Sequence, residues 1–202
     1  MRYLSSLIDY IFKIDTEDDV SLQSLGFDKN TSNLYQGTPW YYLPSIINYL
    51  KVSNTDVFID YGSGKGRVLL FAGRYEFKQI IGVELSKELI DISKNNLKSC
   101  KKILRCKNFD LVNKNAIDYE VPKDSTIIFL FNPFPIEIIN CVIDNIKKSI
   151  FQFPRIVRLV YHNPVYAEHI ERLHGLIRIN KITFTNLNLY KQHCIFYKIP
   201  IK

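Results

Sequence analysis

The stretch that decides the fold reads Val57-Phe58-Ile59-Asp60-Tyr61-Gly62-Ser63-Gly64-Lys65-Gly66-Arg67. Its apolar, β-branched start predicts a buried strand, and the apolar residues spaced three to four apart after it predict a helix. Glycine allows the backbone to turn tightly between the two and lets a ligand approach without a Cβ in the way. The start of the helix also offers unpaired N–H groups to a carboxylate or a phosphate.

Short apolar runs alternate with helical patterns from residue 55 onward, which predicts an α/β fold with βαβ units and a mostly parallel sheet. The expected strands are Val57–Tyr61, Gln79–Leu85, Phe109–Asn113, Thr126–Phe131, Ile156–Tyr161, Leu176–Phe184 and Cys194–Ile199. The expected helices between the earlier strands are Arg67–Tyr75, Lys87–Leu97 and Ile136–Ile150. No long helix is evident between the last two strands, so we expect them to form an antiparallel hairpin at one edge of the sheet.

The residues before the sheet predict an N-terminal extension, 1–38, ahead of the main domain, 39–202. Its first residues place apolar side chains on one helical face, which we expect to pack on the domain. These side chains are Leu4, Leu7, Ile8, Ile11 and Phe12. Thr38-Pro39 looks like a helix cap followed by proline at the first helical position, so a helix is expected from about Pro39 to Lys51.

The sequence gives no sign of a disulfide scaffold, a zinc site, a membrane span or a secretory signal. The four cysteines show no CxxC pair and no zinc spacing, and no segment reads as a membrane span or a secretory signal. A cytoplasmic protein of 202 residues without a metal is therefore expected. The formal charge is +7, and residues 87–107 hold seven basic and two acidic side chains. Such a patch is weak support for a nucleic-acid partner, because a solvated helix face has the same composition.

The spacing of the glycines separates two cofactor classes. A dinucleotide fingerprint is G-x-G-x-x-G, whereas here the glycines are evenly spaced and Arg67 takes the sixth position. Asp60 stands two residues before the first glycine, where it would repel a pyrophosphate and attract an ammonium group. This pattern favours S-adenosylmethionine (SAM), whose amino-acid end carries such a group, over a nicotinamide dinucleotide.

Two further carboxylates fit a nucleoside. Glu84 ends the second apolar run, where a carboxylate accepts hydrogen bonds from both ribose hydroxyls. Asp118 follows the third strand at the same edge of the sheet and suits the adenine amino group, with Ile117 against the ring. Either residue alone would be unremarkable.

Asn132 and Pro133 close the fourth expected strand. Proline keeps the preceding residue out of the helical region, so the carbonyls here point into the cleft and can hold an N–H group whose lone pair faces a methyl donor. His162 ends the fifth strand and is a candidate general base, since the pKa of histidine lies near working pH. Both features also occur as plain structural turns or scaffold residues.

Together these residues resemble the class I SAM-dependent methyltransferases, over roughly residues 35–164. The resemblance implies a Rossmann-like, seven-stranded sheet of order 3-2-1-4-5-7-6 with an antiparallel strand 7, and SAM as the cofactor. The residues it implies around the cofactor are Tyr35, Thr38, Asp60, Gly62, Ser63, Gly64, Gly66, Glu84, Leu85, Ala116, Ile117, Asp118 and Asn132. Asn132, Pro133 and His162 are the expected catalytic residues.

Within the class, DYGSGKGR, GVELS and FNPFP after a Thr-Pro segment are similar to a small bacterial group, and distantly similar to lysine methyltransferases. FNPFP also resembles the Asn-Pro-Pro-aromatic motif of amino- and amide-methylating enzymes, although Phe134 replaces the second proline. We therefore expect methyl transfer to a nitrogen nucleophile such as a protein side chain. O-methylation of a small molecule or glycan, nucleic-acid methylation and a catalytically silent SAM-binding subunit remain alternatives, and the acceptor and oligomeric state stay open.

Overall fold

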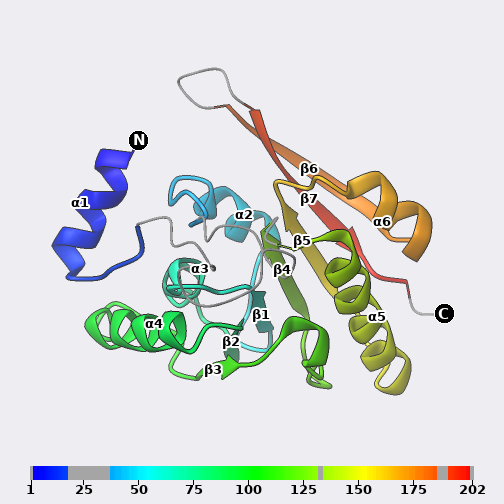
Figure 1. Cartoon of the computed structure of the whole chain (residues 1–202), viewed down its shortest axis with the longest axis horizontal. Helices are drawn as coiled ribbons and strands as arrows, with labels where there is room; N and C mark the ends of the chain where they lie inside the picture. The colour runs from blue at the N-terminus through cyan, green and yellow to red at the C-terminus, as the bar shows by residue number, and fades with distance from the viewer. Residues whose placement is uncertain (1, 18–36, 132–133, 186–190, 201–202) are drawn as a thin grey trace.

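The computed structural model describes residues 2–17, 37–131, 134–185 and 191–200. Over these residues strands and helices alternate along the chain, as Figure 1 shows. The strands are β1 (Val57–Tyr61), β2 (Gln79–Glu84), β3 (Phe109–Asn113), β4 (Ile127–Phe131), β5 (Arg158–His162), β6 (Ile177–Thr185) and β7 (Lys191–Lys198). The helices are α1 (Arg2–Phe12), α2 (Leu43–Leu50), α3 (Arg67–Ala72), α4 (Lys87–Ser99), the short 3₁₀ helix η1 (Ala116–Asp118), α5 (Ile136–Gln152) and α6 (Ala167–His174).

The strands form one seven-stranded sheet in the order β3-β2-β1-β4-β5-β7-β6. The first five strands in the chain pair in parallel, whereas β7 is antiparallel to both β5 and β6. The expected fold class, strand order and antiparallel last strand are thus confirmed. Because β1 and β4 lie side by side at the centre, the carboxyl ends of β1, β2 and β4 meet at one edge, where open α/β sheets bind ligands.

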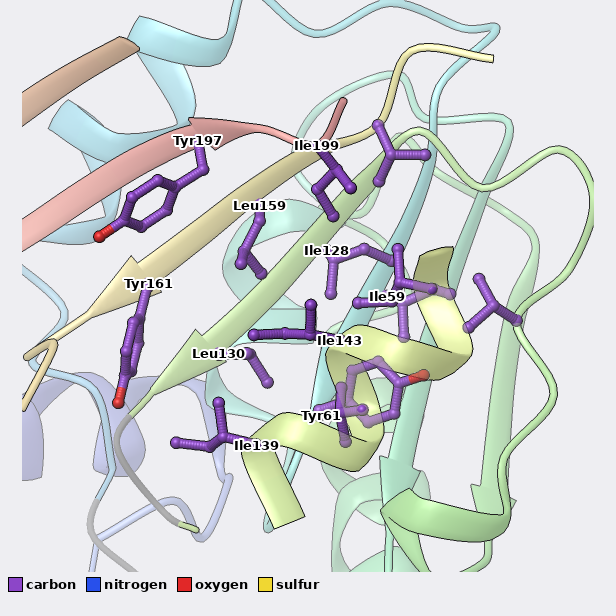
Figure 2. Packing of buried hydrophobic residues seen from close by; sticks show 14 of the residues in the cluster. Ile59, Tyr61, Ile128, Leu130, Ile139, Ile143, Leu159, Tyr161, Tyr197 and Ile199 are labelled. Atoms are coloured by element: carbon purple, nitrogen blue, oxygen red, sulfur yellow. The ribbon is translucent and has the colours of Figure 1, made fainter. Parts of the chain in front are cut away.

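Helices cover both faces of the sheet, and consecutive side chains of a strand serve opposite faces. In β4, Ile128 and Leu130 belong to the core under α5, while Ile127 and Phe129 belong to the core under α2 and α3. Figure 2 shows Ile139 and Ile143 of α5 packed toward β4 and β5. Coverage of both faces explains why the central strands read as continuous apolar runs.

Two expectations about helices need correction. The helix expected from Pro39 begins at Leu43 instead, after a turn in which Tyr42 N–H donates to the Pro39 carbonyl. The reason is Pro44, which has no N–H to donate within a helix and fits only its first turn. Helix α6 was not expected from the sequence, because its core-facing apolar content is little more than Ile170. β7 begins three residues earlier than expected, at Lys191.

Helix α1 packs on the domain through a narrower contact than its apolar face predicts. Ile8 joins a small core with Ile14 and Leu70, whereas Leu7 is 52% exposed and Ile11 is 60% exposed. Figure 1 shows α1 beyond α3, away from the sheet. In the described part of the chain, no helix combines the length and the apolarity that a membrane crossing requires.

The packing of the core under α5 leads to a prediction of how much a cavity there lowers the free energy of unfolding. We expect Ile143→Ala, at a fully buried position, to lower the free energy of unfolding by about 2–5 kcal/mol, because neighbouring side chains only partly fill the space. Ile156→Ala is the matched control: this side chain is 59% exposed, so the change should stay within about 0.5 kcal/mol. Urea denaturation measures both, and equal losses would contradict this description of the core.

Candidate functional site

The glycine turn between β1 and α3 has the backbone conformation that the sequence predicts. Gly62, Gly64 and Gly66 have φ values of 73°, 53° and 83°, in the region that favours glycine. At Gly66 an added Cβ would also collide with the hydroxyl oxygen of Ser93 on α4. The turn is therefore packed against α4 at Gly66.

Asp60 is an unusual carboxylate, because one of its oxygens is buried without a hydrogen-bond partner in the described part of the chain. Its side chain is 2% exposed, and its Oδ2 atom has no hydrogen-bond partner among the described residues. Burial, and then the nearby charge of Glu84, raise the pKa of Asp60 well above its ordinary value. A buried carboxylate in this state attracts a cation or a hydrogen-bond donor.

Glu84 ends β2 and links two neighbouring segments. Its Oε2 accepts a hydrogen bond from Gly64 N–H at 2.9 Å, and its Oε1 accepts one from Ser86 N–H at 3.0 Å. Burial raises the pKa of Glu84, and these backbone hydrogen bonds act in the opposite direction. Leu85 follows, and its carbonyl accepts from the Asn113 side chain at 2.7 Å. The Glu84 carboxylate is thus held in place beside the glycine turn.

The residues expected near an adenine form η1, directly after β3. The Asn115 side chain caps this short helix by accepting from Ile117 N–H at 3.2 Å, and Asn145 of α5 donates to the Ile117 carbonyl at 2.7 Å. Ala116 is buried, whereas Ile117 is partly exposed. Since β3 neighbours β2, the strand order brings η1 to the edge that carries Glu84.

Thr38 is buried, and its carbonyl accepts a hydrogen bond from Arg67 at 3.4 Å. It thus lies beside the first residue of α3, although it does not cap a helix. Tyr35, Asn132 and Pro133, the other expected contacts with cofactor or acceptor, lie outside the described residues.

His162 lies inside an aromatic cluster. The centre of its ring is 5.0 Å from that of Phe131, 5.5 Å from that of Tyr42 and 5.9 Å from that of Phe184. Burial lowers the pKa of His162 to about 4, against a smaller opposing effect of Gln192. The imidazole is therefore neutral at pH 7 and a weak base.

Sequence reasoning missed two site residues, Lys65 and Arg67, whose side chains are buried. Their partners are Asp15, Thr16 and Thr38. Two basic residues within a buried glycine turn indicate that their charged side chains need polar partners. The residues that contact these side chains, however, lie far away in the sequence. In the described ranges, no group of three or more His, Cys, Asp or Glu side chains could hold a metal ion.

Comparisons with known proteins identify the class. A family model described as histone methylation protein DOT1 matches residues 17–134, more than half of the 202 residues. A comparison with curated proteins gave no match.

Solved structures of low identity share the fold. An RNA methyltransferase from Salinibacter ruber in complex with S-adenosyl-L-homocysteine is 17% identical, with a TM-score of 0.59 over 83% of this chain and 95% of that one. A SAM-dependent O-methyltransferase from Thermotoga maritima is 18% identical, with a TM-score of 0.62 over 81% of this chain and 66% of that one. Magnesium protoporphyrin IX methyltransferase from Synechocystis PCC 6803, with bound SAM, is 10% identical, with a TM-score of 0.62 over 79% of each chain.

The buried Asp60 carboxylate and the left-handed glycine conformations of the turn fit the amino-acid end of SAM, the cofactor of this class of enzyme. The chain is a SAM-dependent methyltransferase, and it belongs to the histone methylation protein DOT1 family.

Proposed function

We propose that this methyltransferase acts on a nitrogen nucleophile of a protein side chain. The observation that carries the proposal is the family match, since the family is described by histone methylation and the matched residues include the glycine turn, Glu84 and η1. The asparagine-proline element that follows β4 also lies within the match and suits an N–H acceptor.

For the cofactor, we assign Asp60 to the ammonium group of SAM and Glu84 to the ribose hydroxyls. Ala116, Ile117 and Asp118 would hold the adenine, with Gly62, Ser63, Gly64, Gly66, Thr38, Tyr35 and Leu85 around the rest of the molecule. The unpartnered Oδ2 of Asp60 supports the first assignment, because an ammonium group would compensate this buried charge. SAM supplies a methyl group already attached to a good leaving group.

The chain's own contribution is to position the acceptor and to exclude water. Asn132 and the Pro133 carbonyl would orient the acceptor nitrogen through its N–H groups, so that its lone pair faces the methyl donor. They follow Phe131, whose Cα pairs with that of His162 across β4 and β5. His162 is better suited to packing in the aromatic cluster than to serving as a base, since it is buried against Tyr42 and Phe184. This placement gives no support to O-methylation, which needs a base or a metal.

One observation favours a second candidate, a nucleic-acid acceptor. Exposed cations follow α4 and the loop after it, and the residues concerned are Lys87, Lys94, Lys98, Lys101, Lys102, Arg105 and Lys107. The solved structures that share the fold also include an RNA methyltransferase.

Asp60→Asn tests the cofactor assignment through two opposite effects. At pH 7 the variant should be more stable by about 1–2 kcal/mol, because it removes a buried, unpaired carboxylate. Its affinity for S-adenosylhomocysteine should fall at least about tenfold, since the ammonium partner is lost. Denaturation and calorimetric binding measure the two effects, and a variant that is less stable but binds normally would contradict the assignment.

The contribution of Asp60 to the stability of the free protein should also depend on pH in a defined direction. The unfolded Asp60 carboxyl has the ordinary pKa of 3.8, while the folded one has a raised pKa. Between these two values the folded state binds more protons, so the free energy of unfolding falls as pH rises. Between pH 5 and pH 7 the lowered pKa of His162 acts in the opposite direction, and it does so in both proteins. The contribution of Asp60 is therefore the free energy of unfolding of the wild type minus that of Asp60→Asn, and urea denaturation should show this difference decrease from pH 5 to pH 7. An equal slope in both proteins would contradict it.

The acceptor class is tested by methyl transfer from labelled SAM to fractionated lysate, with protease and nuclease digestion of the product. We expect label in protease-sensitive material, and we expect that label to survive mild alkaline treatment, which hydrolyses methyl esters. Asn132→Ala should reduce turnover at least about tenfold with little change in S-adenosylhomocysteine affinity, because the residue is assigned to the acceptor. Nuclease-sensitive label would instead support the nucleic-acid candidate, and equal loss of turnover and affinity would remove the role of Asn132.

A further inference from the structure

Two buried cations occupy the glycine turn. Lys65 is 3% exposed and Arg67 is 7% exposed, although each carries a charge that prefers water. Cations in such a turn would ordinarily be assigned to an anionic ligand. Both side chains instead contact the N-terminal segment 13–17, which we call the strap.

Lys65 joins the strap by an ion pair. Its Nζ lies 2.7 Å from Asp15 Oδ1 and donates a second hydrogen bond to the Glu17 carbonyl at 3.1 Å. Asn96 of α4 then connects strap and turn, because its amide donates to the carbonyls of Asp15, at 2.6 Å, and Lys65, at 2.9 Å. Asn96 Oδ1 also accepts from Asp15 N–H at 2.9 Å. One asparagine therefore fixes the backbone of both segments.

Arg67 contacts two segments at once. Its Nε donates to Thr16 Oγ1 at 3.1 Å, and its Nη2 donates to the Thr16 carbonyl at 2.6 Å. Its Nη1 donates to the Thr38 carbonyl at 3.4 Å. A Cβ on Gly37 would come within 2.9 Å of the guanidinium, which explains the glycine there. The planar, forked guanidinium is suited to several carbonyls in different directions.

Helix α1 also holds the strap, through hydrogen bonds to Asp9. Asp9 accepts from Thr16 N–H at 2.6 Å, from the Thr16 hydroxyl at 2.8 Å and from Glu17 N–H at 3.1 Å. Asp9, Thr16 and Arg67 are all buried, so this is a continuous polar network between α1 and the first residue of α3. Removing one member leaves the others buried without partners.

We propose that the strap is a working part of the cofactor site, and that Arg67 is a positioning residue for SAM. Arg67 holds the Thr38 carbonyl and the strap against the turn, and its Nη2 also lies 3.9 Å from the Glu17 carboxylate of the strap. The inference rests on the proposed function, because Thr38 and the turn are assigned there to the cofactor. It accounts for both buried cations without an anionic ligand.

Arg67→Lys is the test, and Arg155→Lys is its matched control. Arg155 also donates to several backbone carbonyls, those of Pro122, Ser125 and Ser149, but at the opposite edge of the sheet. In both variants lysine keeps the positive charge but lacks the forked guanidinium group with its several N–H donors. Calorimetric affinity for S-adenosylhomocysteine is measured well below the melting temperature of each protein. We expect about a tenfold weaker affinity for Arg67→Lys and less than a twofold change for Arg155→Lys. This difference should hold even if both variants have lower melting temperatures than the wild type.

A milder pair of variants applies if Arg67→Lys does not fold. Asp15 is 55% exposed, so Asp15→Asn removes the partner of Lys65 without disturbing a core. The control is Asp124→Asn, which removes the partner of Lys78 from an exposed pair. We expect a loss of affinity of about threefold for Asp15→Asn and none for Asp124→Asn.

The outcomes separate this inference from the proposed function. A wild type that does not bind S-adenosylhomocysteine would overturn both. A wild type that binds, together with normal affinity in Arg67→Lys and Asp15→Asn, or equal losses in the controls, would overturn the inference alone. A loss in Arg67→Lys that disappears at high salt would also overturn it, because such a dependence assigns the cation to an anionic ligand.

Discussion

The close packing of the glycine turn on β2 is the constraint on which the rest of the structure depends. Gly62 N–H and Ser63 N–H both donate to the Val83 carbonyl, at 2.8 and 3.2 Å, so the chain leaving β1 stays against β2 before it becomes α3. Gly82 makes this possible, because a Cβ there would meet Leu69 and Ser63. The same contact brings Glu84 within reach of Gly64 N–H. Fold and site therefore share one piece of backbone geometry.

The features that depend on local pattern were predictable from the sequence. β1 has the expected bounds, Val57–Tyr61, because a buried strand bounded by turn residues leaves little choice of boundary. β3 also has the expected bounds, Phe109–Asn113, although its residues are only partly buried or exposed. The position of η1 also follows, since residues after parallel strands gather at one edge. The start of α2 was predicted at Pro39 instead of Leu43, because the prediction relied on Thr38-Pro39 and neglected the missing N–H of Pro44.

The strap was not predictable, for a physical reason. Its contacts join residues about 50 positions apart, such as Lys65 to Asp15, and no periodicity or motif encodes such a pair. Residues 1–30 hold six acidic side chains, and nothing in their composition indicates that Asp9 is a buried acceptor and Asp15 an ion-pair partner. Buried charge needs specific partners, and composition does not name them.

The attachment of α1 has a consequence for cooperativity. Helix α1 contributes little apolar packing, and Leu7 and Ile11 face solvent, so its docking depends on the polar network behind the strap. A segment held in this way opens locally at a free energy well below that of global unfolding. If the docked strap favours the cofactor, thermodynamic reciprocity requires the cofactor to favour the docked strap by the same factor. Helix α1 would then be most ordered when the enzyme is loaded, and this helix, which lies beyond α3 and away from the sheet, would report on events at the cofactor site.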